Sequence, residues 1–185
     1  MKRKNKILML DFIKDIFRRR FLKRAANGNE TRLLPLSAIR SVTVILDTDD
    51  PSYNDCKEAV MSFFRQNNIK VSIWFLDFAK KSSDERQTTS MSNTITEKDL
   101  NWWGRPSVDK IAAFSEEKPD MLISLAATPT FTSGCLAACS KAGFKIGRHR
   151  TKGRIFDLMI EDSPSKSYNS LEAFNAIKDY INTIQ

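Results

Sequence analysis

The sequence predicts a single α/β domain with a doubly wound, mostly parallel five-stranded sheet of the Rossmann-like or flavodoxin-like kind, preceded by a basic amphipathic helix. Short apolar runs rich in β-branched residues alternate with stretches of helical spacing, which is typical of a parallel sheet covered on both faces. Glycine and proline are scarce, with six of each in 185 residues, which disfavours a loop-rich or all-β fold. Basic residues are concentrated at the amino terminus.

The first expected element is a helix in which apolar residues recur at helical spacing from Ile7 to Arg19. It is expected to end around Ala25–Gly28, where Asn27, Gly28 and Asn29 form a stop signal. Its bulky apolar residues fill about half of the helix circumference at ~100° per residue. They are Met9, Leu10, Phe12, Ile13, Ile16 and Phe17. We therefore divide the chain into a leader of residues 1–28 and an α/β domain over residues 35–185.

Periodicity then predicts the elements of the domain in order. The expected strands are residues 41–47, 69–75, 120–125, 144–147 and 156–160. The expected helices are residues 55–66, 108–114, 132–142 and 171–184. Residues 79–98 are polar and rich in Ser and Thr, so we expect them to form an exposed loop.

The charge of the chain is distributed unevenly. Residues 1–24 hold ten of the 30 Lys and Arg residues and two of the 22 acidic residues, a net charge of +8. The remaining 20 basic and 20 acidic residues cancel. Any attraction to a polyanion must therefore come from the leader, and we expect it to weaken with salt.

Several classes of protein are disfavoured by the composition. Three cysteines and one histidine make neither a disulfide framework nor a typical zinc site, and a reducing, cytoplasmic setting is the simplest. The apolar stretch of the leader is too short for a signal peptide, and no run of ~18 apolar residues predicts a membrane span. We find no DNA-reading motif and predict no metal site and no cofactor.

Two passages carry a resemblance to known families. The segment DLNWWGRP, followed by KPDMLISLA, KAGFKIGR and FDLMIE, resembles an uncharacterised bacterial family of small Rossmann-like proteins classed as a domain of unknown function. The resemblance covers most of residues 35–185. It implies a basic N-terminal helix and carries no assigned activity.

Residues 120–148 are also similar to the N-terminal half-domain of heptosyltransferase-type GT-B glycosyltransferases. Those enzymes bind a nucleotide sugar in a second Rossmann domain and catalyse in the cleft between the two. We expect no second domain in this chain, so the resemblance supports the fold and disfavours glycosyl transfer by this chain alone.

The strongest acidic cluster follows the first expected strand, at Asp47, Asp49, Asp50 and Asp55. Ligands of doubly wound sheets lie at the carboxyl ends of the strands. The segment VILDTDD resembles the start of haloacid-dehalogenase phosphatases, which implies Asp47 as nucleophile, Asp49 as acid and Mg²⁺ as cofactor. The alternative is an acidic helix N-terminus in which these residues stabilise the first turn. The loop lacks the glycines of a phosphate-binding turn, which disfavours a dinucleotide site.

Other candidate ligand-binding residues each have a structural alternative. Trp103, Arg148, His149 and Arg150 could contact an anionic or aromatic ligand. A solvated loop is the alternative for the three basic residues, and of the adjacent Trp102 and Trp103 we expect one to be buried and one exposed. Cys135 and Cys139 share a helix face and are expected to pack on the sheet.

The leader carries the main functional hypothesis, a non-catalytic cytoplasmic protein held at an anionic surface, the inner face of a membrane. The residues expected to contact that surface are basic: Lys14, Arg18, Arg19, Arg20, Lys23 and Arg24. The residues expected to enter the bilayer are Phe12, Ile13, Ile16 and Phe17. Three alternatives stay open: RNA or ribosome binding through the same helix, a protein partner, and packing of the apolar face onto the domain. A small transferase or phosphatase centred on Asp47 is the competing enzymatic hypothesis.

Overall fold

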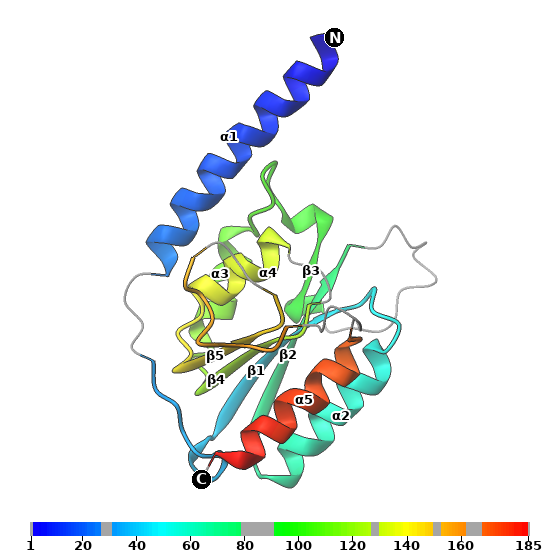
Figure 1. Cartoon of the computed structure of the whole chain (residues 1–185), viewed down its shortest axis with the longest axis vertical. Helices are drawn as coiled ribbons and strands as arrows, with labels where there is room; N and C mark the ends of the chain where they lie inside the picture. Colours follow the sequence, from blue (N-terminus) through cyan, green and yellow to red (C-terminus); the bar gives the residue numbers. More distant parts are fainter. Residues whose placement is uncertain are drawn as a thin grey trace.

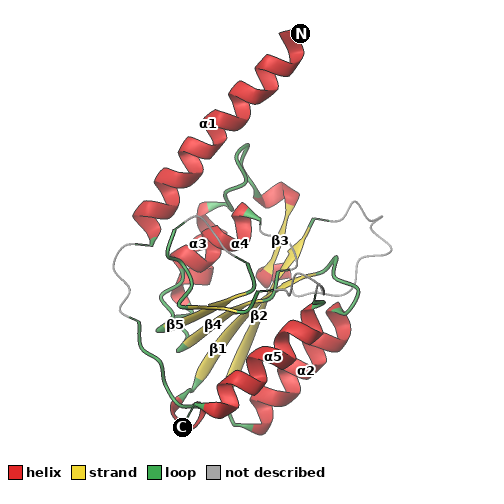
Figure 2. Cartoon of the chain, in the orientation of Figure 1, coloured by secondary structure: helices red, strands yellow, loops and turns green. Residues whose placement is uncertain are grey.

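A computed structural model describes residues 2–26, 31–78, 91–126, 130–149, 153–161 and 168–184, with the side chains of the first helix described from Leu10 onward. These residues form five α-helices and one six-stranded sheet (Figures 1 and 2). The strand order is β3-β2-β1-β4-β5-β6, and each neighbouring pair is parallel. The predicted α/β class and parallel sheet are confirmed.

The centre of the sheet is built from apolar, β-branched residues. The strands are β1 (Ser41–Asp47), β2 (Lys70–Asp77), β3 (Thr94–Thr96), β4 (Met121–Ser124), β5 (Phe144–Gly147) and β6 (Leu158–Met159). In β1, every residue from Val42 to Asp47 is buried, as expected of a central parallel strand. Val44 pairs with Ile73 on one side and with Ile123 on the other, so β1 lies at the middle of the layer.

Helices cover both faces of the sheet. The helices are α1 (Lys2–Ala25), α2 (Tyr53–Gln66), α3 (Val108–Glu116), α4 (Phe131–Cys139) and α5 (Ser170–Thr183). Helices α2 and α5 lie side by side on one face, while α3, α4 and the end of α1 lie on the other (Figure 1). Each face has its own apolar core.

The two cores use residues that the helical spacing places on one side. On the first face, Val60 and Phe64 of α2 meet Phe174 and Ile177 of α5. On the second face, the small residues of α4 let that helix lie close to the sheet, and Leu22 of α1 joins the cluster. Side-chain caps define the starts of α3, α4 and α5, at Ser107, Thr130 and Asn169 respectively.

Two predictions about the sheet were wrong. The sheet has six strands among the described residues rather than five, because Thr94–Thr96 forms β3 beside β2. These residues fall in the segment predicted to be an exposed loop; their polar, Thr-rich composition hides a three-residue edge strand whose central Ile95 is buried. Residues 79–90 of that loop lie outside the described residues. The last strand, expected over 156–160, is confined to Leu158–Met159.

Candidate functional site

The loop of residues 101–105, which we call the cradle, contacts the first helix. The Asn101 Oδ1 atom accepts hydrogen bonds from the backbone nitrogens of Trp103, at 3.2 Å, and Arg105, at 2.9 Å. The nitrogen of Gly104 donates to the Asn101 carbonyl oxygen at 2.9 Å. Gly104 has a φ of +88°, a left-handed conformation that favours glycine. The segment DLNWWGRP therefore builds a closed turn that presents two tryptophans.

Trp103 is the centre of the contact between α1 and the body of the protein. Its side chain is buried, with 9% exposed, while Trp102 is 56% exposed, which confirms the expected division between the two tryptophans. The Trp103 ring lies 5.9 Å from the ring of Phe21 and 5.4 Å from that of Phe131 in α4. Trp103, which the sequence suggested as a ligand contact, thus packs against Phe21 of α1 and Phe131 of α4.

Arg18 joins α1 to the same cradle. Its Nε atom donates a hydrogen bond of 2.8 Å to the carbonyl oxygen of Trp103, and its guanidinium lies 5.1 Å from the centre of the Phe131 ring. The Arg105 guanidinium lies 5.1 Å from the centre of the Phe21 ring. These contacts fix the second half of α1, so Arg18 serves the junction with the body.

The first half of α1 projects beyond the body (Figure 1). Phe12 is 67% exposed, Ile16 38% and Phe17 46%. At about 100° per residue, Phe12, Ile13 and Ile16 lie roughly opposite the face that carries Arg18 and Leu22. We call Phe12, Ile13, Ile16 and Phe17 the apolar arc; only Phe17, at its edge, makes ring contacts with the tryptophans of the cradle. Ile13 is partly buried, so Phe12 and Ile16 are the members of the arc that are exposed without a ring contact to the tryptophans.

Basic side chains follow the apolar arc along the helix. Arg20, Lys23 and Arg24 are exposed. Arg19 is exposed too and forms an ion pair of 3.3 Å with Asp15, while Lys14 lies 3.7 Å from Asp11. The exposed side of α1 thus runs from apolar at residues 12–17 to cationic at residues 19–24.

A cavity of about 670 Å³ opens beside the docked end of α1. One wall is formed by α1, and the other by the end of α4, β5 and residues 153–157. The charged residues that line it are Arg19, Lys23, Lys145, Arg154 and Asp157. The cavity is therefore mostly cationic, although the body as a whole has no net charge.

The carboxyl edge of the sheet holds the acidic cluster that the sequence singled out. Asp47 is buried at the end of β1, and its Oδ1 atom accepts a 3.0 Å hydrogen bond from the nitrogen of the exposed Asp49. Burial raises the pKa of Asp47, and the neighbouring charges of Asp49, Asp50 and Asp77 act in the same direction. A carboxyl group of raised pKa can transfer protons, but within the described residues no group of three His, Cys, Asp or Glu side chains could hold a metal ion.

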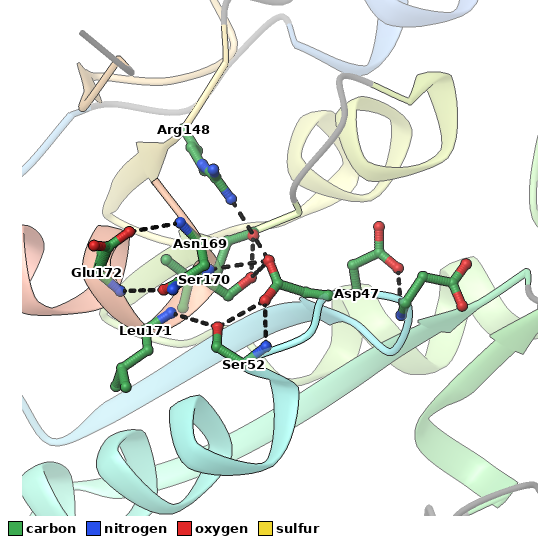
Figure 3. A network of polar contacts seen from close by, with 10 residues as sticks. Asp47, Ser52, Arg148, Asn169, Ser170, Leu171 and Glu172 are labelled. Atoms are coloured by element: carbon green, nitrogen blue, oxygen red, sulfur yellow. Dashed lines mark hydrogen bonds and ion pairs between the residues drawn. The ribbon is translucent and has the colours of Figure 1, made fainter. Parts of the chain in front are cut away.

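A buried polar network brings together Ser52, Arg148 and Ser170 (Figure 3), and Asp50 is at its centre. One of its carboxylate oxygens accepts from the nitrogen and hydroxyl of Ser52, at 2.8 and 2.6 Å. The other accepts from the nitrogen and hydroxyl of Ser170, at 3.0 and 2.8 Å, and lies 3.9 Å from Arg148. Burial disfavours the charged form, yet these hydrogen bonds outweigh it and lower the pKa of Asp50.

The Asp50 network joins two helix N-termini. Ser52 immediately precedes α2, and Ser170 is the first residue of α5. The Ser52 hydroxyl also accepts a hydrogen bond from the nitrogen of Leu171, at 3.1 Å. Helix N-termini favour negative charge, so Asp50 stabilises both at once. This agrees with the structural alternative for the acidic cluster, with Asp50 as the residue that provides the stabilisation.

The remaining candidates are dispersed. Arg148 is buried in the Asp50 network, His149 is partly buried after β5, and Arg150 lies outside the described residues. Cys135 is buried and Cys139 partly buried on α4, as expected of packing residues. A hydrogen bond between the two thiols raises the pKa of Cys135 and lowers that of Cys139.

The chain was compared with known proteins. Residues 11–184 match a family of unknown function, DUF6913. The chain belongs to that family. The matched residues include most of α1 as well as the sheet, so helix and body occur together in the family pattern. No curated protein and no solved structure matches the chain.

Three residues of the site had escaped the sequence reasoning. Lys145 and Arg154 line the cationic cavity, and Gly104 shapes the cradle. Lys145 stands inside an apolar strand pattern, and a lysine at such a position is a signal that sequence reasoning could have used. No periodicity predicts that Arg154 lines the same cavity as α1, because this depends on the tertiary structure.

Proposed function

We propose that the protein docks peripherally on an anionic lipid surface through α1, with the apolar arc entering the interface and the basic residues contacting lipid phosphates. The observation that carries the proposal is the exposure of the arc: Phe12, Ile16 and Phe17 keep 38–67% of their surface exposed. Interfacial helices are recognised by an apolar face together with a cationic one. Among the helices described, none combines the length and the apolar character required to cross a bilayer.

The direction in which the arc points supports docking. The residues that hold α1 to the body, Arg18, Phe21 and Leu22, lie away from the centre of the arc on the helix circumference. A flat surface can therefore approach the arc from the side opposite the body. Because the first half of α1 also extends past the other elements, the bilayer and the sheet do not compete for the same space (Figure 2).

The energetics favour anionic over neutral lipid. Burial of a Phe or Ile side chain contributes about 1.5–3 kcal/mol. Each basic residue near an anionic surface adds about 1 kcal/mol, and Arg20, Lys23 and Arg24 are exposed beside the arc. Neither contribution is large alone, so we expect reversible binding that needs both.

In this proposal, α1 holds the α/β body at the membrane surface. Its strand order is that of doubly wound nucleotide-binding folds, which supports a Rossmann-like assignment. A cytoplasmic protein held at the inner face of the membrane is consistent with the reduced cysteines expected from the sequence. The leader places the body at the surface, and the activity of the body is a separate question.

Flotation of the full chain with vesicles tests the proposal. We expect binding to vesicles of phosphatidylcholine with phosphatidylglycerol and little binding to phosphatidylcholine alone. The double variant Phe12→Ser and Ile16→Ser should lower partitioning by about tenfold or more. The double variant Arg20→Gln and Arg24→Gln should lower it by about tenfold and make it less sensitive to salt. Equal flotation of wild type and the apolar variant would contradict the proposal.

The same variants separate lipid from RNA. A helix that binds phosphates of RNA does so through its basic residues and gains nothing from Phe12 or Ile16. We would measure retention of a labelled single-stranded RNA by the same variants. If the protein retained RNA through Arg20 and Arg24, was unaffected by the apolar substitutions and did not bind vesicles, the RNA alternative would be favoured and lipid docking overturned.

A further inference from the structure

The cavity beside α1 has the chemistry of an anion site. Four cationic side chains line it, Arg19, Lys23, Lys145 and Arg154, against one carboxylate, Asp157. Arg19 and Lys23 come from α1, whereas Lys145 and Arg154 come from the body. These charges converge from two segments far apart in the chain, which a solvated charge run would not require.

Lys145 is the least expected of the four. Its residue is 5% exposed, in the middle of β5, and its Nζ atom donates a 2.9 Å hydrogen bond to the Ala137 carbonyl oxygen in the last turn of α4. The carboxyl end of a helix favours a cation. Burial lowers the pKa of Lys145, and Asp157 counteracts this. Burying a lysine costs free energy that an apolar residue would not cost, and the hydrogen bond at the end of α4 offsets part of that cost.

Both carboxylate oxygens of Asp157 accept hydrogen bonds within the protein. One of its carboxylate oxygens accepts a 2.8 Å hydrogen bond from the nitrogen of Lys145. The other accepts a 2.6 Å hydrogen bond from the Thr31 hydroxyl. The carboxylate thus offsets one of the four positive charges that line the cavity, and the lining keeps a cationic surplus.

We propose that this cavity binds a phosphate ester, held between α1 and the body by Lys23, Lys145 and Arg154. Its volume of about 670 Å³ falls in the range of small-molecule sites and exceeds that of a single inorganic ion. Leu22 and Ile155 give the lining an apolar part, which suits an ester with a carbon skeleton better than free phosphate. A ligand that contacts both walls would also fasten the docked end of α1.

This inference can be tested apart from membrane docking, because the apolar arc does not line the cavity and, of the three residues proposed to hold the ester, only Lys23 lies in α1. The phosphate ester could be a soluble metabolite or the headgroup of a lipid. We would therefore measure binding of glycerol-3-phosphate to the full chain by calorimetry, with glycerol as the uncharged comparison. In parallel, we would measure binding to phosphatidylcholine vesicles that contain phosphatidic acid.

The decisive variant is Arg154→Gln, matched by Lys141→Gln, which removes one positive charge from an exposed residue of the body that does not line the cavity. We expect saturable binding of glycerol-3-phosphate that is weakened about tenfold by Arg154→Gln and changed less than about twofold by Lys141→Gln. Lys145→Met should weaken binding at least as much as Arg154→Gln. If the Lys145→Met variant does not fold, the test rests on Arg154→Gln.

Each outcome decides the inference. Dependence on Arg154 with the soluble ester identifies a metabolite site, and dependence on Arg154 with vesicles alone identifies a lipid headgroup. Binding of both ligands that is equal in wild type, Arg154→Gln and Lys141→Gln, or absent in all three, would overturn the proposal. Loss of vesicle binding in the Phe12→Ser and Ile16→Ser variant, with glycerol-3-phosphate binding retained, would leave the cavity assigned and locate docking in the arc.

Discussion

The two faces of the sheet are covered in different ways. On one face, α2 and α5 pack along their length, and the buried Asp50 network ties their N-termini together. On the other, α3 and α4 cover the strands, but α1 docks only through its second half. That face keeps an exposed apolar arc and a cationic cavity. The face covered by α2 and α5 stabilises the fold. The face covered by α3, α4 and α1 has the features expected of a surface that binds a ligand or a membrane.

The largest expected effect lies on the closed face, at Asp50→Asn. An amide cannot accept from all four donors of Ser52 and Ser170, and it leaves Arg148 without its ion pair to Asp50. We expect the free energy of unfolding to fall by about 3–5 kcal/mol in urea denaturation. The control Asp49→Asn, an exposed carboxylate of the same loop, should change it by less than about 0.5 kcal/mol. Equal losses in the two variants would show that the network is not what closes this face.

On the open face, Trp103→Ala should have the next largest effect. Truncation removes the ring that packs between Phe21 and Phe131, at a cost of about 3 kcal/mol. Trp102→Ala, on the exposed neighbour, should cost less than about 1 kcal/mol. Hydrogen exchange should show that residues 18–25 lose protection in the first variant only. If those amides stay protected, α1 is held by something other than the cradle.

Gly104→Ala should loosen the same junction more mildly. A Cβ atom there combines a left-handed φ of +88° with a 3.2 Å approach to the Arg18 guanidinium, and we expect a loss of about 1–2 kcal/mol. Gly153→Ala is the matched control, because Gly153 also has a positive φ, of +107°, but a Cβ atom there would lie in ordinary contact, 3.9 Å from the Ile155 side chain. Both variants should be destabilised, and only Gly104→Ala should increase exchange in α1.

The smallest expected effect is a pH dependence at Asp47. Its folded pKa is raised above 3.8, so its ionised form opposes folding. Asp47→Asn should therefore increase the free energy of unfolding at neutral pH, and the gain should shrink as pH falls through the folded pKa toward 3.8. Asp50 behaves in the opposite way: its lowered pKa provides stability that is lost as pH falls below 3.8. A loss of stability in Asp47→Asn at neutral pH would assign the ionised carboxylate a structural role.

The sequence predicted most of the fold because strand and helix periods are local. Residues 41–47 and 144–147 were predicted with the bounds that the structure has, since both are short apolar runs between clear breaks. The strand Thr94–Thr96 was missed because three polar or mixed residues carry no period, and only pairing with Phe75–Asp77 makes them a strand.

The site was less predictable for a physical reason. The charge surplus and the apolar arc of α1 are properties of one segment and were read directly. The cradle at Trp103 depends on tertiary contacts such as the hydrogen bond between Arg18 and Trp103, which are 85 positions apart. The position of Lys23, Lys145 and Arg154 around one cavity depends on the tertiary structure as well. Spacing along the chain contains no information about such contacts.

The central claim is that the apolar arc enters a bilayer while the opposite side of the projecting first half of α1 stays in water. We would attach nitroxide labels to Ile16→Cys and Asp11→Cys in a Cys139→Ser background and compare collisions with oxygen and with a water-soluble nickel complex. On anionic vesicles, the label at residue 16 should become accessible to oxygen and shielded from nickel, while that at residue 11 stays accessible to nickel. Equal access of nickel to both labels on vesicles would contradict the account.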